Sequence, residues 1–228
     1  MTTRTSDQQH AATSTVLIVD DHPVLRRGLA ALIESESDLV VCGEAATGKE
    51  ALDLVCAKQP DAVIVDITLE GSDGLALIKT MRSRHPNVPA LVLSMHDESA
   101  YAERSLRAGA KGYVMKQQLD DTVIVALRCV LAGETYMSDA MKTRFATKFV
   151  GGRTLETGSP LGALTDRELQ VFGMVGRGNT TRKIATELNL SVKTIESHLE
   201  HIKQKLTLGS AAELAQRATQ WVETGDAG

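Results

Sequence analysis

Five short apolar runs recur along the first 133 residues at intervals of roughly 22 to 28 residues, and this spacing limits the fold more than any other feature. The first four runs are rich in Val, Ile and Leu and do not alternate with polar residues, which is typical of strands buried on both faces of a sheet. The fifth run is weaker. The runs cover residues 16–19, 39–42, 62–65, 90–93 and 112–115.

Amphipathic stretches follow these runs, each with an apolar stripe at helical spacing. This alternation predicts an α/β domain with a doubly wound, five-stranded parallel sheet and helices on both faces. Right-handed crossover connections restrict its topology further. The predicted helices cover residues 23–34, 49–58, 74–82, 99–108 and 119–131.

Polar side chains follow four of the five runs. In an open parallel sheet the site lies beyond the carboxyl ends of the strands, so residues far apart in the sequence converge on one edge. The set contains three carboxylates, one hydroxyl and one amine, and Tyr113 lies inside the fifth run. Its members are Asp20, Asp21, Asp66, Ser94 and Lys116.

The chemistry of this set favours phosphoryl transfer to a carboxylate. Clustered carboxylates repel one another without a cation, and hard oxygen ligands favour Mg²⁺ or Mn²⁺. Asp66 is then the nucleophile. Lys116 would offer a point charge to the phosphoryl oxygens, and Ser94 a hydrogen bond. A lone aspartate at a strand end more often caps the next helix, but the joint pattern favours a phosphoacceptor site.

Four segments carry a resemblance to the response-regulator receiver domain, over about residues 15–133. The resemblance implies that Asp66 accepts phosphate from a partner histidine kinase, and that Asp20 and Asp21 hold Mg²⁺ with Asp66 and the backbone carbonyl of Thr68. It also implies that Ser94 and Lys116 contact the phosphoryl group and that Tyr113 is an aromatic switch; a half-buried strand tyrosine is the alternative. The segments are VLIVDDHPVLRRGL, VIVDITLEGSDGLALIK, LVLSMHDE and AGAKGYVMK.

The sequence departs from this family pattern at two positions. Glu70 stands where such domains often have proline, and it adds an acidic group near the metal edge. Gln117 stands where proline often follows the lysine, which predicts a trans peptide after Lys116. The resemblance also implies that Thr68 and His96 tune the lifetime of the phosphoryl group, although a plain surface histidine is the alternative for His96.

The strand pattern stops near Gly133, and four helical patterns without a strand follow a linker. The predicted organisation is a flexible tail (1–14), a receiver domain (15–133), a partly helical linker (134–160) and a small all-α domain (161–224). Thr165 with Glu168 has the spacing of a capping box, and Ser191 is positioned to cap the third of these helices. The second and third helices, joined by a tight turn, form a helix-turn-helix.

The segments LTDRELQVF and IATELNLSVKTIESHLEHIKQKL resemble the LuxR-type helix-turn-helix of the NarL/FixJ regulators, over about residues 161–222. The third helix would enter the major groove of double-stranded DNA. Residues 177–205 hold six Lys and Arg against three Glu, so their local net charge is +3 although the whole chain carries −4. Glu196 and Glu200 reduce the local potential, so we expect dimers on paired half-sites.

Outward residues of the helix-turn-helix are the candidate DNA contacts. Lys193, Thr194 and Ser197 are candidates for base edges. His198 faces either the core or a phosphate, and the sequence leaves both open. The candidates for phosphate contacts are Thr180, Thr181, Lys183, His201 and Lys205. The predicted core of this domain is Leu164, Leu169, Val171, Phe172, Ile184, Ala185, Leu188, Val192, Ile195, Leu199 and Ile202.

Composition excludes several other classes. No apolar stretch approaches the ~18 residues that span a bilayer, and the polar amino terminus lacks the apolar region of a Sec signal. Cys42, Cys56 and Cys129 are far apart and form no CxxC, so a disulfide framework or zinc site is not expected. We expect three buried or half-buried thiols and a cytoplasmic protein.

The sequence therefore predicts a phosphorylation-controlled transcription regulator, with no enzymatic activity beyond its own phosphorylation and dephosphorylation. One alternative is a phosphorylation-independent regulator whose receiver serves as a dimerisation module. Another is an aspartyl-phosphate phosphatase of the haloacid-dehalogenase type, which needs Asp-x-Asp-x-Thr/Val after the first strand. Residues 20–23 read Asp-Asp-His-Pro instead.

Overall fold

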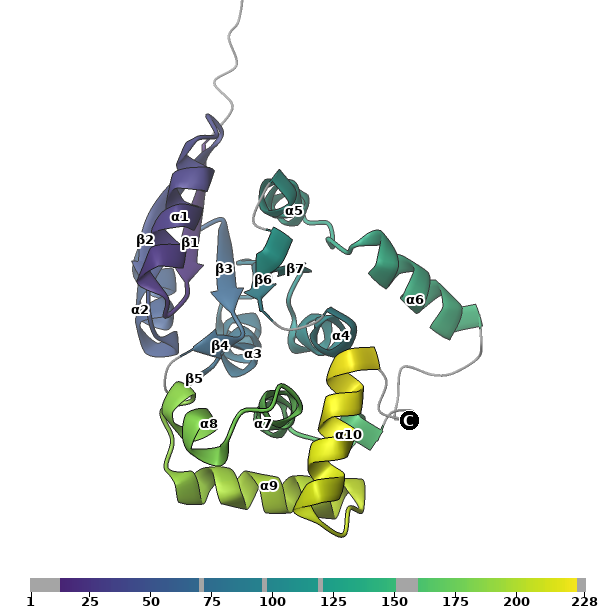
Figure 1. Ribbon diagram of the computed structural model, residues 1–228. Helices are drawn as coiled ribbons and strands as arrows, with labels where there is room; N and C mark the ends of the chain where they lie inside the picture. The colour runs from purple at the N-terminus through teal and green to yellow at the C-terminus, as the bar shows by residue number, and fades with distance from the viewer. Residues whose placement is uncertain (1–12, 70–71, 96–97, 119–120, 151–159, 225–228) are drawn as a thin grey trace, which may run out of the picture.

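The computed structural model describes residues 13–69, 72–95, 98–118, 121–150 and 160–224 (Figure 1). The predictions for residues 1–12 of the tail, residues 151–159 of the linker, Glu70 and His96 lie outside these ranges. Among the described residues, no helix is both long enough and apolar enough to cross a bilayer.

Five parallel strands form one sheet, as the apolar runs predict, and their order is β2-β1-β3-β6-β7. A second, two-stranded antiparallel sheet lies in the connection after β3 and pairs Thr68 with Asp73; the sequence pattern did not indicate it. The strands are β1 (Ser14–Val19), β2 (Leu39–Ala45), β3 (Ala62–Asp66), β4 (Thr68–Leu69), β5 (Ser72–Asp73), β6 (Ala90–Ser94) and β7 (Gly112–Met115).

Helices cover both faces of the five-stranded sheet, so the predicted doubly wound fold is confirmed (Figure 1). Alternate residues of each strand point to opposite faces. Val16 and Ile18 of β1 therefore pack with α1 (Pro23–Glu34) and α5 (Asp121–Leu131). Leu17 and Val19 pack on the other side, with the remaining receiver helices. Those are α2 (Gly48–Lys58), α3 (Gly74–Arg84) and α4 (Glu98–Ala108).

Two expectations about burial are wrong. Strand β2 lies at the edge of the sheet, so its residues are not buried on both faces, and the Val40 side chain is 38% exposed. An edge strand has a neighbour on one side only, which leaves part of its surface to solvent. The Cys56 thiol is exposed near the end of α2, whereas Cys42 and Cys129 are half-buried as expected.

The second half of the chain is helical. Thr165 and Glu168 form the predicted capping box at α7, and Thr180 and Ser191 cap α8 and α9. Asn189, with φ of 49°, makes the tight turn between α8 and α9, a conformation that asparagine tolerates better than most residues. The helices are α6 (Asp139–Val150), α7 (Asp166–Gly176), α8 (Thr181–Glu187), α9 (Val192–Leu206) and α10 (Ala211–Thr224).

The core of the helix-turn-helix domain gathers around α7. The rings of Phe172 and Trp221 lie 5.6 Å apart between α7 and α10. Nine of the eleven predicted core residues are buried, and Leu199 is partly buried. Val192 is 39% exposed, so its prediction as a core residue is wrong. It stands at the first position of α9, directly after the capping residue Ser191.

Helix α7 lies between the receiver and α9 (Figure 1). Its inner side faces α3 and α4 of the receiver, and the buried side chains of the two domains form one continuous apolar cluster. Helix α9 therefore lies on the side of the helix-turn-helix domain that faces away from the sheet.

Candidate functional site

The strand ends bring Asp20, Asp66 and Lys116 together at one edge of the sheet. The Nζ atom of Lys116 lies 2.6 Å from Asp20 Oδ2 and 2.6 Å from Asp66 Oδ2. The three side chains are each no more than 4% exposed. Asp20 follows β1, Asp66 ends β3 and Lys116 follows β7, so parallel pairing of these strands builds the contact across nearly a hundred residues.

Asp21 and His22 extend the site toward solvent. The buried Asp21 Oδ1 atom lies 2.7 Å from His22 Nδ1, and that ring nitrogen is also 3.1 Å from Asp20 Oδ1. The backbone amide of His22 donates to the same Asp20 oxygen at 2.7 Å. Ligand atoms of Asp20, Asp21, His22 and Asp66 all lie within 4.8 Å of one another. His22 is not among the predicted site residues, although it directly follows the aspartate pair.

Ser94 and Tyr113 come from the two neighbouring strands. Asp66 pairs in register with Leu93, so Ser94 stands one residue beyond it at the same edge. The Ser94 side chain is fully buried, and Tyr113 is 2% exposed in β7. The register thus places Ser94 beside the acidic edge, whereas Tyr113 pairs with Val92, two residues before Ser94. Tyr113 as a switch remains a prediction.

The loop after β3 holds the acceptor carboxylate. The backbone amide of Thr68 donates to Asp66 Oδ1 at 3.1 Å. The amide of Gly74, at the start of α3, donates to the Ile67 carbonyl at 2.9 Å. A Cβ atom at Gly74 would lie 2.1 Å from the backbone oxygen of Asp66, so only glycine lets α3 begin this close to the acceptor. The apolar and polar patterns of the sequence do not indicate this role; its signal is a glycine that directly follows the aspartate capping α3.

Burial and opposite charge compete at this site. Burial raises the pKa of Asp66 to about 6 and Asp20 adds to the rise, whereas Lys116 opposes it. Burial also disfavours the charged form of Lys116, but Asp66 and Asp20 together outweigh that effect and raise the pKa of Lys116. One ammonium thus balances two buried carboxylates, and Asp21 adds a third acidic group.

The residues present fit a divalent cation. The carboxylates of Asp20, Asp21 and Asp66 are hard oxygen donors, the kind that Mg²⁺ and Mn²⁺ prefer. The Thr68 carbonyl as a further ligand remains a prediction. Although His22 Nδ1 lies 2.7 Å from the buried Asp21 Oδ1 atom, the geometry is not that of a hydrogen bond, and this oxygen accepts none from the described residues. An acidic group in that position gains most from a cation because water cannot fully solvate it.

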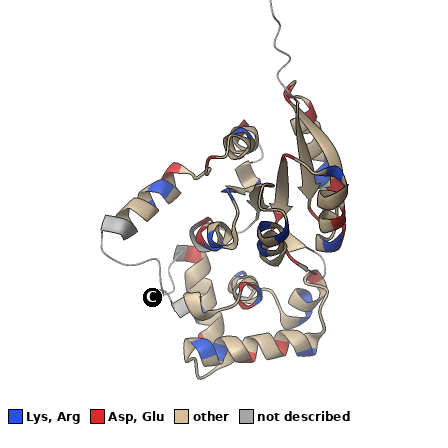
Figure 2. Cartoon of the chain, turned by 180° about the vertical axis from the view of Figure 1, so that it is seen from behind, with Lys and Arg blue, Asp and Glu red and all other residues tan. Residues whose placement is uncertain are grey.

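The outward face of α9 is the candidate DNA interface. Lys193 and Ser197 are exposed, and Thr194 is half-buried beside the Ser191 hydroxyl at 2.7 Å. Basic residues stand at both ends of the helix with glutamates between them (Figure 2). Glu196 and Glu200 are exposed on this face, which weakens its positive potential as the sequence analysis expects.

The candidate phosphate contacts fall into two groups. Thr180 and Lys183 are exposed at the start of α8, where the Thr180 hydroxyl accepts from the Lys183 amide, and Thr181 is half-buried. Lys205 and His201 approach Glu168 instead, with Nζ and Nδ1 at 2.7 and 3.9 Å from its carboxylate oxygens. Their DNA contacts remain predictions.

His198 is half-buried next to α7. Burial lowers its pKa, and the nearby Arg167 adds to this effect. Of the two alternatives left open by the sequence, its position favours the core side of the domain over a phosphate contact.

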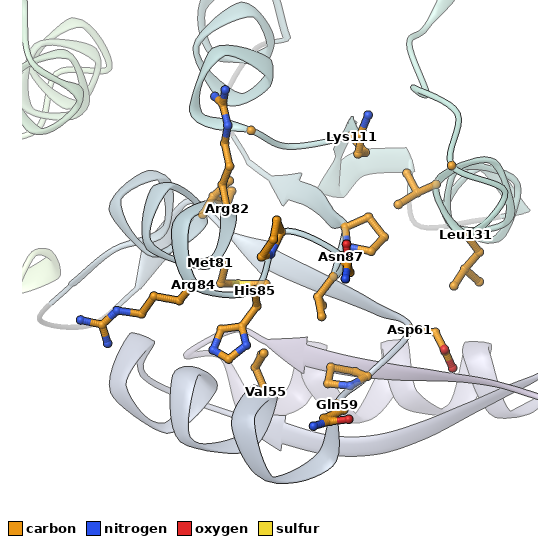
Figure 3. Close-up of a pocket in the computed structure, with 18 of the residues that line it drawn as sticks. Val55, Gln59, Asp61, Met81, Arg82, Arg84, His85, Asn87, Lys111 and Leu131 are labelled. Carbon is orange, nitrogen blue, oxygen red and sulfur yellow. The ribbon is translucent and has the colours of Figure 1, made fainter.

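A cavity of about 770 Å³ opens at the opposite edge of the sheet (Figure 3). Arg82, Arg84 and His85 from the end of α3 line it, together with Gln59 and Asp61. It contains none of the residues at the acidic edge and is therefore separate from the site described above.

A doubly wound α/β domain with this acidic edge, followed by a helix-turn-helix domain, defines a two-domain response regulator. Residues 16–128 match the response regulator receiver domain, and residues 162–218 match the family of bacterial regulatory proteins named after luxR. A curated relative is the oxygen regulatory protein NreC of Staphylococcus carnosus, 37% identical over 207 residues that make up 89% of this chain and 95% of that protein. NreC of Staphylococcus aureus is 35% identical over the same shares.

Solved structures show the same architecture. A LuxR-family response regulator from Aurantimonas is 34% identical with a TM-score of 0.57, over 61% of this chain and 99% of its own. RcsB of Salmonella typhimurium has a TM-score of 0.65 at 24% identity, over 92% of this chain and 98% of its own. At this identity the similarity is evidence for the fold and not for function. Another structure, 25% identical with a TM-score of 0.56 over 90% and 97%, contains two RcsB dimers on two parallel DNAs. The chain belongs to the NarL/FixJ family of response regulators, transcription regulators with a receiver and a LuxR-type DNA-binding domain.

Proposed function

We propose that Asp66 accepts a phosphoryl group from a histidine kinase and that this modification controls promoter binding. One observation carries the proposal most directly: Lys116 lies 2.6 Å from the carboxylates of both Asp20 and Asp66 at the buried edge of the sheet. Buried carboxylates that share one ammonium, beside a buried hydroxyl, are costly to maintain for stability alone.

The residues of the site divide the work of the transfer. An oxygen of Asp66 attacks phosphorus, the bond from phosphorus to the donor nitrogen breaks, and that nitrogen takes up a proton as it leaves. Lys116 balances the charge of the phosphoryl oxygens, and the Ser94 hydroxyl donates to one of them. When bound, Mg²⁺ or Mn²⁺ would lower the repulsion between these oxygens and the carboxylates. Asp20, Asp21, Asp66 and the Thr68 carbonyl would hold it.

Phosphorylation is proposed to act on DNA binding through dimerisation and the contact between the domains. The phosphoryl group replaces the single charge of the Asp66 carboxylate with a more negative group and brings three strong acceptor oxygens to the edge of the sheet. Ser94 and Lys116 then close on the group, and Tyr113 fills the space that Ser94 leaves. The RcsB dimers on DNA described above support a dimer as the binding form. A regulator that binds promoters must be in the same compartment as the chromosome, so a cytoplasmic location of the protein remains our prediction.

Mapping the phosphorylated residue tests this proposal. With acetyl phosphate and Mg²⁺, the intact mass of the full chain should increase by one phosphoryl group, and that of Asp66→Ala should not change. Apart from the proposed cation ligands Asp20 and Asp21, Asp66 is the one carboxylate of the described residues in the pocket with Lys116. Asp53→Asn is the matched control: Asp53 is exposed on α2 and should not affect uptake. Retained uptake by Asp66→Ala, with the phosphoryl group on another residue, would refute the site.

A further inference from the structure

The helix-turn-helix domain contacts the loop that carries the phosphoacceptor. Gln170, in the middle of α7, donates from Nε2 to Thr68 Oγ1 at 3.0 Å. Gln170 is only 6% exposed, and Thr68 is half-buried. The Thr68 amide in turn donates to Asp66 Oδ1 at 3.1 Å. One residue of the receiver thus joins the DNA-binding domain to the acceptor carboxylate.

Charged contacts hold α7 in this position. Arg104 of α4 donates from Nη1 to the Leu164 carbonyl at 2.9 Å and from Nη2 to the Leu161 carbonyl at 2.6 Å. The same side chain lies 3.1 Å from Asp166, which also pairs with Lys79 of α3 at 3.0 Å. Helices α3 and α4 of the receiver therefore both form polar contacts with the amino-terminal end of α7 and the residues before it.

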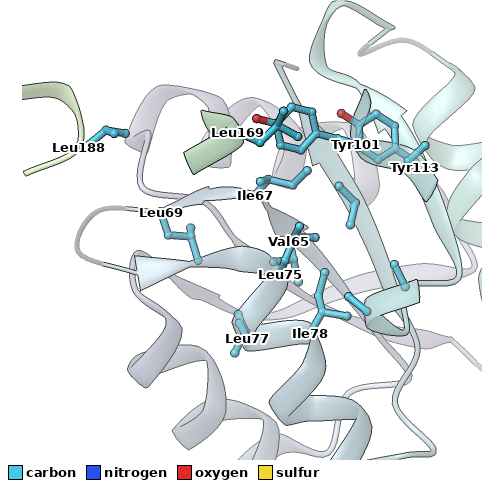
Figure 4. Close-up of a cluster of buried hydrophobic side chains, with 14 of the residues drawn as sticks. Val65, Ile67, Leu69, Leu75, Leu77, Ile78, Tyr101, Tyr113, Leu169 and Leu188 are labelled. Atoms are coloured by element: carbon cyan, nitrogen blue, oxygen red, sulfur yellow. The ribbon is translucent and has the colours of Figure 1, made fainter. Parts of the chain in front are cut away.

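Apolar contacts complete the docking. Leu169 of α7 is 1% exposed and joins the receiver cluster that contains Ile67, Leu69 and Tyr101 (Figure 4). Ile67 and Leu69 flank Thr68 in the sequence. Both belong to the same apolar cluster as Leu169, so the hydrogen bond from Gln170 does not stand alone.

The docked arrangement leaves the predicted DNA-reading face uncovered. Lys193 and Ser197 are exposed, and α9 is separated from the receiver by α7 (Figure 1). The contact between the domains therefore does not block access of DNA to α9. It involves instead the loop after β3, which positions Asp66.

We propose that Gln170 is a positioning residue for the phosphoryl chemistry of the receiver, acting through Thr68. Its hydrogen bond holds the loop after β3 in the arrangement that suits the free carboxylate of Asp66. A phosphoryl group on Asp66 needs room and hydrogen-bond donors at this loop, so docking of α7 slows uptake. Because the coupling of two equilibria is reciprocal, phosphorylation loosens the same contact. This inference rests on the proposed function of Asp66.

Initial rates of phosphoryl uptake from acetyl phosphate and Mg²⁺, measured on the full chain, test the inference. Gln170→Ala should raise the rate by about fivefold, the factor that a hydrogen bond of ordinary strength corresponds to. Gln216→Ala is the control, because Gln216 is exposed on α10. An unchanged rate in Gln170→Ala would overturn the inference, whereas absence of uptake on Asp66 in the unaltered chain would overturn the proposed function instead.

A double-mutant cycle separates positioning from mere packing. If Gln170 acts through Thr68, then Gln170→Ala should add nothing to the rate of a Thr68→Val chain. A full additional increase in that background would contradict the proposed route.

Loss of folding is excluded by a second substitution and an internal probe. Gln170 also accepts from Arg167 at 2.6 Å, so Gln170→Met, which keeps the bulk of the side chain, is compared with Gln170→Ala. Trp221 is the one tryptophan of the chain and packs on Phe172 in the same domain, so its emission and melting report on α7. The uptake rate is compared for each variant whose Trp221 emission and melting temperature match those of the unaltered chain. If such a variant takes up phosphate at the rate of the unaltered chain, the inference is refuted.

Discussion

At the scale of single residues, the acceptor loop depends on close packing of particular residues as much as on their charges. Gly74 brings α3 against the backbone of Asp66, and Thr68 and Lys116 bind the two oxygens of the acceptor carboxylate. The polar members of this set could be predicted, because carboxylates, a hydroxyl and an amine that gather at strand ends indicate a specific chemistry. Gly74 could not, because a glycine at a helix start has no chemistry of its own.

Gly74→Ala should destabilise the receiver by about 1–3 kcal/mol, since the new Cβ would meet the Asp66 carbonyl oxygen at 2.1 Å and the loop must move. Thermal unfolding measures this, and uptake of phosphate should fall with it. Gly28→Ala is the control: nothing lies within 4 Å of a Cβ there, and alanine favours the helix by up to about 1 kcal/mol. Equal melting temperatures for the two variants would show that Gly74 has no such role.

At the scale of the helices and strands, local signals predicted the elements well. Thr165 with Glu168, Thr180 and Ser191 begin helices where their side chains can accept backbone hydrogen bonds. The errors arise where tertiary position overrides the local pattern. Val192 follows the apolar spacing of α9 but lies exposed at its first position. Val40 belongs to an apolar run that forms the edge strand.

Glu168 ties α7 to α9 and should make the stability of the helix-turn-helix domain depend on pH. Burial of Glu168 favours its neutral form, but Lys205 and the capping bonds to Thr165 outweigh this and lower its pKa. A lowered pKa in the folded state stabilises the protein above the unfolded pKa, and this contribution is lost as the pH falls through the folded value.

Glu168→Ala should therefore cost about 1–2 kcal/mol near neutral pH and less in acid. Denaturant unfolding followed by Trp221 emission at several pH values measures the difference from the unaltered chain. Glu196→Ala, at an exposed position of α9, is the control and should change stability little. A constant difference across the acid range would contradict the ionic origin of this effect.

At the scale of the whole molecule, the docking of α7 on the receiver was beyond sequence analysis. Leu169 fits the apolar pattern of a helix-turn-helix core, and nothing local distinguishes it from a residue that also contacts another domain. In the sequence Gln170 is an ordinary helix residue, and only the structure shows its hydrogen bond to Thr68. Periodicity assigns a side chain to the inside or outside of its own element, whereas a contact between domains depends on how two finished surfaces meet.

Arg104→Ala should loosen the docked arrangement, because it removes the bonds to the Leu161 and Leu164 carbonyls and one partner of Asp166. Small-angle scattering should give a larger radius of gyration with both domains still folded. Arg107→Ala is the control, since Arg107 is exposed and pairs within α4 with Glu103. A scattering curve identical to that of the unaltered chain would mean that this clamp does not hold the domains together.

Genome-wide capture of DNA by the full chain, with and without acetyl phosphate, tests the control of promoter binding by Asp66 most directly. Phosphodonor should increase occupancy at a defined set of sites for the unaltered chain and leave it unchanged for Asp66→Asn. Some binding without phosphodonor is expected, because a modification shifts a pre-existing equilibrium and the α9 face is already exposed. The same occupancy with and without phosphodonor in a chain that does take up phosphate on Asp66 would contradict the account.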